Sequence, residues 1–63
     1  MLITKEEYDA MPPKSQGYVT YYQADWEGSK IPKVNPYAEG TPEAKDWNEG
    51  NFIAMLQVQD SEE

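Results

Sequence analysis

Three residue types are missing from this chain of 63 residues, which has no cysteine, no histidine and no arginine. Without cysteine no disulfide can form, and without cysteine and histidine the usual thiolate and imidazole ligands of zinc are absent. The lack of histidine also excludes a Ser-His-Asp catalytic triad. Arginine is the preferred side chain for phosphate and guanine, so its absence counts against direct binding of DNA or RNA.

Long apolar runs are missing as well. No stretch approaches the roughly 20 apolar residues that cross a membrane. The N-terminal residues MLITKEEYD lack the basic region and apolar run of a signal peptide. Together with the absence of cysteine, these features predict a cytoplasmic protein without membrane association. The length predicts one domain near the lower size limit for independent folding.

The chain is rich in negative charge, with twelve acidic residues against five lysines and a formal net charge of -7. One interpretation is that this excess only keeps the protein soluble. The other is that an acidic face docks on a basic protein surface, including a surface that normally holds nucleic acid. Under this second interpretation, the expected partner is a protein with a basic surface.

Helix-capping signals predict a short N-terminal helix near residues 5–10. Thr4 is a good N-cap, and Glu7 three residues later completes a capping box. Pro12 and Pro13 cannot donate a hydrogen bond to a continuing helix, so they end it.

A second helix is predicted near residues 14–27, with Gly28 as its stop. Tyr18, Tyr22 and Trp26 fall on one arc of this helix. We interpret these aromatic side chains as core residues, in preference to a stacking platform for nucleic-acid bases.

Glycine, proline and asparagine mark residues 28–40 as a loop. Asn35 and Pro36 suit a turn in which the asparagine side chain bonds the backbone ahead of it. This turn is expected to carry Tyr37 back onto the helices.

The third helix is predicted near residues 42–57, with Thr41 as N-cap and Pro42 in the first turn. Gly50 costs about 1 kcal/mol relative to alanine inside a helix, so close approach of the second helix is expected there. The predicted core stripe consists of Ala44, Trp47, Asn51, Ala54, Met55 and Val58.

These elements predict a single all-α domain of two main antiparallel helices joined by an Asn-Pro-Tyr loop. Residues 1–12 form the short helix and its proline stop, residues 13–58 the helical hairpin, and residues 59–63 a frayed acidic tail. Tyr18, Tyr22, Trp26, Tyr37 and Trp47 are expected to form the core.

Acidic side chains on and just before the third helix have three interpretations. A weak site for a hard cation would use Glu39, Glu43, Asp46 and Glu49, and a metal-dependent hydrolase would use the last three of these. A solvated acidic face is the interpretation we favour. We predict no catalytic residue, no cofactor and no bound metal, because a chain this short can hardly enclose a cleft.

Three large apolar residues, Phe52, Ile53 and Leu56, lie roughly 140–240° from Trp47 around the third helix, away from the core stripe. Either the first helix covers them, or they form an exposed patch that marks a homodimer or partner interface. In the first case they would be buried with Leu2, Ile3, Tyr8 and Met11.

Several short motifs resemble the ribosome modulation factor family over roughly residues 14–56. They are Gly17-Tyr18, the Asn-Pro-Tyr of residues 35–37, and Trp47 to Gly50 followed by Ala54-Met55. The resemblance implies a small helical fold whose founding function is to bind ribosomal RNA and promote inactive ribosome dimers in starved bacteria. Similar domains occur in phage and plasmid proteins. The positions implied to support the fold are Tyr18, Asn35, Pro36, Tyr37, Trp47 and Gly50.

The ribosome binders of this family are strongly basic, and they usually carry a second aromatic residue where this chain has Asn51. Our leading hypothesis is therefore a non-enzymatic acidic protein-binding module, such as a phage-encoded inhibitor or regulator of a host protein. Its predicted contact residues are Glu39, Glu43, Asp46, Glu49, Phe52, Ile53 and Leu56. The alternative is a divergent ribosome-associated modulation factor that uses Lys14, Lys30, Lys33 and Lys45.

Overall fold

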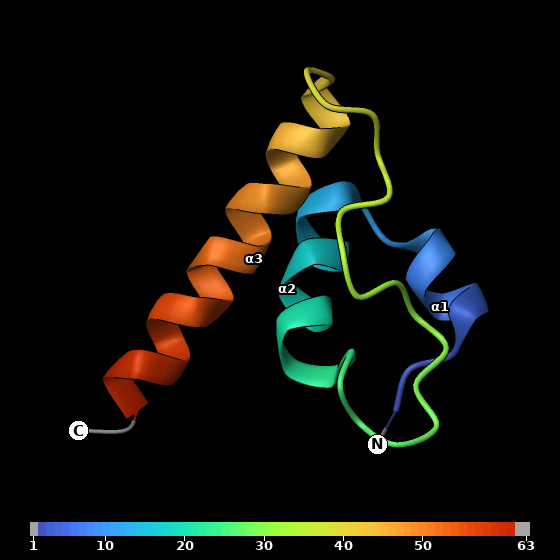
Figure 1. Cartoon of the computed structure of the whole chain (residues 1–63), viewed down its shortest axis with the longest axis vertical. Coiled ribbons are helices and arrows are strands. Elements are labelled where there is room, and N and C mark those ends of the chain that lie inside the picture. Colours follow the sequence, from blue (N-terminus) through green and yellow to red (C-terminus); the bar gives the residue numbers. More distant parts are fainter. Residues whose placement is uncertain (1, 62–63) are drawn as a thin grey trace.

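The computed structural model describes residues 2–61, and within them it contains three helices and no strand. They are α1 (Lys5–Ala10), α2 (Pro13–Gln23) and α3 (Pro42–Ser61). The helices α2 and α3 pack together, while α1 lies on the other side of α2 (Figure 1). The predicted all-α class is confirmed.

The two main helices run in the same general direction, since both descend in the view of Figure 1. Their contacts follow the same order: Lys14 pairs with Glu49, and Tyr18 further along α2 bonds Gln57 further along α3. The predicted antiparallel arrangement is therefore wrong. A helix rises 1.5 Å per residue and an extended chain about twice that, so residues 24–41 suffice to return along α2 before α3 begins.

Two glycines allow the backbones of α2 and α3 to touch where they cross. A Cβ atom on Gly17 would lie 1.9 Å from the carbonyl oxygen of Trp47, and one on Gly50 would lie 1.8 Å from that of Lys14. Close approach of α2, the predicted reason for Gly50, is confirmed. Asn51 adds a hydrogen bond across the crossing, because its Nδ2 donates to the Gly17 carbonyl at 3.0 Å.

Two sides of α2 are buried. Gly17 lies against α3 at the crossing. Gln16, Thr20 and Ala24, spaced four residues apart, are buried on the side toward α1 and the loop, where Gln16 bonds the Tyr8 carbonyl, Thr20 bonds the Pro32 carbonyl and Ala24 packs with Tyr8 and Ile31. Among the predicted aromatic core residues, Trp47 is buried and Tyr18 and Tyr37 are half-buried. Tyr22 and Trp26 are exposed, so their assignment to the core is wrong. Trp26, 48% exposed, follows the end of α2 at Gln23.

The predicted capping box starts α1. The Glu7 N–H donates to Thr4 Oγ1 at 3.0 Å, and the Thr4 N–H donates to Glu7 Oε1 at 2.8 Å. Tyr8 docks α1 against the rest of the fold, because its buried ring packs with Ala24 and Ile31. The loop residue Ile31 was not among the predicted core residues.

A buried chain of hydrogen bonds joins all three helices and the loop. The Trp47 indole N–H donates to the Tyr8 hydroxyl at 3.0 Å, and Gln16 Nε2 donates to the Tyr8 carbonyl at 2.8 Å. The Tyr37 hydroxyl in turn donates to Gln16 Oε1. Because buried polar groups are costly when unpaired, this network ties α1 and the loop to the α2–α3 pair.

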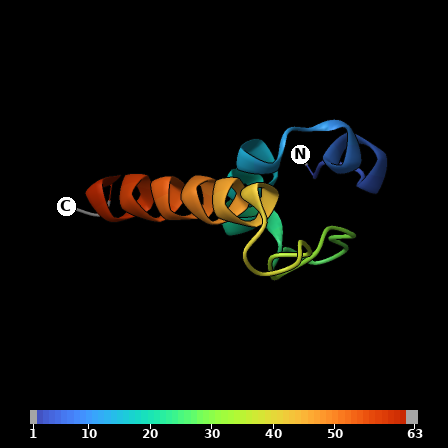
Figure 2. The same ribbon diagram turned by 90° about the horizontal axis from the view of Figure 1, so that it is seen from above.

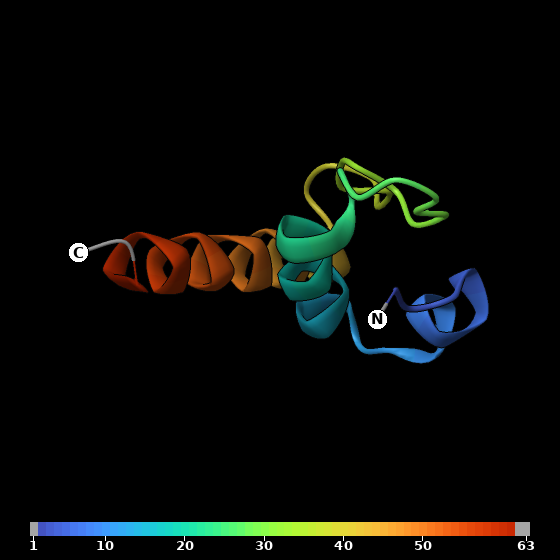
Figure 3. The same cartoon turned by 90° about the horizontal axis from the view of Figure 1, so that it is seen from below.

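The C-terminal half of α3 projects beyond the rest of the molecule (Figures 2 and 3). The helix continues to Ser61, so the predicted frayed tail is wrong for residues 59–61; residues 62–63 lie outside the described part.

The predicted core stripe of α3 is confirmed, because Ala44, Trp47 and Ala54 are buried and Asn51, Met55 and Val58 half-buried. Within residues 2–61 no helix combines the length and apolarity that a membrane span requires.

Candidate partner-binding surface

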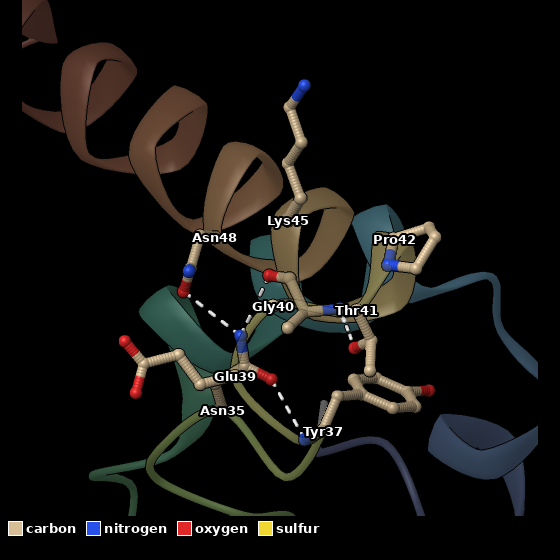
Figure 4. A pocket seen from close by; sticks show the side chains of 9 residues that line it. Asn35, Tyr37, Glu39, Gly40, Thr41, Pro42, Lys45 and Asn48 are labelled. Carbon is tan, nitrogen blue, oxygen red and sulfur yellow. Dashed lines mark hydrogen bonds between the residues drawn. The ribbon is translucent and has the colours of Figure 1, made fainter.

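Hydrogen bonds of Asn35 and Thr41 join the loop to the start of α3 and position this helix. We call this set of bonds the joint. Asn35 Oδ1 accepts the Tyr37 N–H at 3.0 Å, which is the predicted turn. Asn35 Nδ2 donates to the Ala44 carbonyl at 2.9 Å and to Asn48 Oδ1 at 3.0 Å (Figure 4). Thr41 Oγ1 accepts the Ala44 N–H at 3.1 Å, as an N-cap should.

An open hollow of about 770 Å³ lies at this joint. The side chains of Asn35 and Thr41 that line it are already engaged in the bonds just described. Lys45 points away from it in Figure 4. The hydrogen bonds of Asn35 and Thr41 therefore orient α3, and these two side chains are already used within the fold.

Three predicted contact residues, Glu43, Asp46 and Glu49, are exposed on α3, and Glu39 is exposed on the loop before it. Within the described chain, no three acidic side chains gather closely enough to hold a metal ion. The cation-site and hydrolase interpretations thus receive no support from the geometry.

Glu49 is engaged in an ion pair with Lys14 of α2 at 2.8 Å, and both side chains are about half exposed. The hydrogen bond and charge of Lys14 hold the pKa of the Glu49 carboxyl below its ordinary value. The same interaction raises the pKa of the Lys14 ammonium. This pair bridges the two main helices at their crossing.

Apolar side chains are exposed on the outer face of α3. Phe52 is 54% and Leu56 43% exposed, while Ile53 is half-buried. The prediction that the first helix covers them is wrong, because Tyr8 docks α1 against Ala24 and Ile31 instead. We call Phe52, Ile53 and Leu56 the outer patch.

Carboxylates lie at both ends of the outer patch. Glu49 precedes Phe52 by three residues and Ile53 by four, and Asp60 follows Leu56 by four. Residues at these spacings are neighbours on a helix surface. The patch is therefore an apolar strip between acidic groups.

A groove of about 370 Å³ runs beside the outer patch, between α2 and α3. The hydroxyl of Tyr18, one of its walls, donates to Gln57 Oε1, which holds the ring across the two helices. Sequence reasoning missed this groove, although Gly50 next to large apolar residues is a signal for it. Its lining residues are Met11, Lys14, Ser15, Tyr18, Val19, Gly50 and Ile53.

The lysines of the alternative hypothesis are dispersed. Lys30 and Lys33 are exposed on the loop and Lys45 on α3, while Lys14 is neutralised by Glu49.

Comparisons of the chain with protein-family models, with curated proteins and with solved structures found no significant match. The resemblance to the ribosome modulation factor family therefore stays a prediction from short motifs.

Proposed function

We propose that this protein is a non-enzymatic binding module that docks the outer face of α3 on a basic surface of another protein. The observation that carries the proposal is the exposure of Phe52 and Leu56 between carboxylates on a helix that projects from the fold. Protein interfaces commonly have this composition, with an aromatic or aliphatic centre and a polar rim.

The two components of the surface have different roles in binding. Burying a side chain the size of leucine or phenylalanine contributes about 1.5–3 kcal/mol, so the outer patch supplies affinity. The acidic groups accelerate association with a basic partner and select against acidic ones. A second copy of this chain is a poorer partner, since each copy carries a formal charge of -7. An inhibitor or regulator encoded by a phage is one biological form of such a module.

The alternative function is that of a divergent ribosome-associated factor. It is supported by the structural roles of the motif residues Asn35, Tyr37, Trp47 and Gly50, each of which joins two parts of the fold. The dispersed lysines and the negative charge oppose contact with ribosomal RNA.

Sedimentation with bacterial ribosomes over a salt series separates the two functions. We expect the protein to remain in the supernatant at all salt concentrations, and the immobilised chain to retain a basic protein from the ribosome-depleted lysate. Salt-sensitive sedimentation with ribosomes would contradict the leading proposal and support the alternative.

A further inference from the structure

We propose that the groove between α2 and α3 receives an apolar side chain from a lysine- or arginine-bearing amphipathic helix of the partner. This inference rests on the proposed function and deepens it, because it assigns the shape and chemistry of the segment that is bound. The patch and the groove form one surface, since Ile53 belongs to both.

The groove has the lining of an anchor pocket. Met11, Tyr18, Val19 and Ile53 contribute apolar walls, and each of them is only partly buried by the fold. A leucine, methionine or phenylalanine of the partner would complete the burial of these walls. Such central apolar anchors supply most of the affinity in many interfaces.

The charge beside the groove specifies a basic segment. Lys14 lines the groove and pairs with Glu49. Their side chains are 53% and 50% exposed, so the ion pair is open to competition from solvent and from a partner's charges. A partner ammonium or guanidinium group can take over the Glu49 carboxylate, with Asp46 one helical turn before it. Two carboxylates, Asp46 and Glu49, stand against the single ammonium of Lys14 here, so an acidic segment would be repelled.

The partner segment is assigned as a helix because of the geometry of the apolar groups. Phe52, Ile53 and Leu56 form a strip along α3, and such a strip matches the apolar face of a second helix. The other common mode, addition of a strand to a sheet edge, has no template within residues 2–61, which contain no strand.

The test uses the full chain and a synthetic amphipathic helical peptide of about 18 residues, with a leucine face and a lysine face. One control peptide is a scrambled version of the same composition, and a second carries glutamate in place of lysine. Binding is measured by isothermal titration calorimetry. We expect the leucine–lysine peptide to bind, and the other two to bind at least about tenfold more weakly, the scrambled one because it lacks the apolar face.

Two variants of an exposed groove residue test the anchor directly. Ser15→Phe fills the groove from its rim, whereas Ser15→Ala leaves it open. We expect Ser15→Phe to weaken peptide binding about tenfold and Ser15→Ala to leave it unchanged. Equal binding by both variants would contradict the proposal that the groove receives an apolar side chain of the partner. Circular dichroism checks that each variant stays folded.

A comparison of two charge changes provides a second test. Lys14→Gln and Lys5→Gln both remove one positive charge from an exposed ion pair, with Glu49 and Asp9 respectively. Only the first releases the carboxylate beside the groove. We expect Lys14→Gln to raise peptide affinity several-fold more than Lys5→Gln, and equal effects would count against the assignment.

The peptide's location is read from chemical-shift changes in nuclear magnetic resonance spectra. We expect the largest changes at Met11, Val19, Gly50 and Ile53. If the peptide shifts the signals of Phe52 and Leu56 but leaves those of Met11, Val19 and Gly50 unchanged, the anchor is wrong while the proposed function stands. If no peptide binds although a basic protein is captured from lysate, the helical-segment inference alone is overturned. If the chain captures no basic protein either, the proposed function fails too.

Discussion

At the scale of single residues, Gly50 shows how a tertiary contact reverses a local preference. Alanine is a better helix former than glycine by about 1 kcal/mol, so helix propensity alone would make Gly50→Ala stabilising. The added Cβ would lie 1.8 Å from the Lys14 carbonyl oxygen, where backbone must move. We expect the free energy of unfolding to fall by about 2 kcal/mol or more, measured by chemical denaturation.

Gln59→Ala is the control for this prediction, because Gln59 is exposed on the same helix. It should change stability by no more than about 0.5 kcal/mol. A rise in stability for Gly50→Ala would show that the helices do not cross with their backbones in contact.

The ion pair between Lys14 and Glu49 gives a prediction about titration. Lys14 lowers the pKa of the Glu49 carboxyl, so this carboxyl stabilises the fold above its ordinary pKa of 4.5 and loses that contribution as the pH falls through the lowered value. Lys14→Met should raise the pKa of Glu49 toward 4.5, as measured by ¹³C resonance titration. Lys5→Met, which breaks the pair with Asp9, should leave the Glu49 pKa unchanged.

The stability effect of Lys14→Met should be small, because both partners are about half exposed and water screens their attraction. An unchanged Glu49 titration in this variant would mean that the two side chains do not pair in solution.

At the scale of elements, Asn35 connects the loop to α3 through its side-chain amide. Asn35→Ala removes these bonds and the turn bond to Tyr37, and leaves the Ala44 carbonyl without that donor. We expect a loss of about 1–3 kcal/mol in the free energy of unfolding, measured by urea denaturation. Val34→Ala, at the neighbouring residue with 73% exposure, should be nearly neutral. Similar losses in both variants would contradict the role of the joint.

Features that depend on neighbouring residues were predictable from the sequence. The capping box at Thr4, the N-cap at Thr41 and the turn at Asn35 follow from local hydrogen-bonding chemistry, and all three are present. Gly50 was also predictable, because a glycine inside a helix needs a tertiary reason. Each of these inferences needs information from only a few residues.

Features that depend on the packing of distant segments could not be predicted from the sequence. The exposure of Trp26 follows from the early end of α2 at Gln23, which leaves Trp26 outside the helix. The exposure of Leu56 follows from the docking of Tyr8 on the opposite side of α2. The relative direction of α2 and α3 depends on the path of residues 24–41, for which local propensity gives no signal.

At the scale of the whole molecule, the fold separates its stabilising groups from the proposed binding groups. The hydrogen-bond network through Tyr8, Gln16 and Trp47 lies inside, where it joins the helices. Phe52 and Leu56 lie on the projecting half of α3, where they contribute little to the core. Changes to the outer patch should therefore affect binding while leaving the fold intact.

The most direct measurement compares Leu56→Asp with Val34→Asp in capture of a basic protein from bacterial lysate. Both variants place one extra carboxylate at an exposed apolar position, but only Leu56 belongs to the outer patch. We expect Leu56→Asp to abolish capture of the protein that the unaltered chain retains, and Val34→Asp to preserve it, with unchanged circular dichroism in both. Equal capture by the two variants, or equal loss, would contradict binding through the outer face of α3.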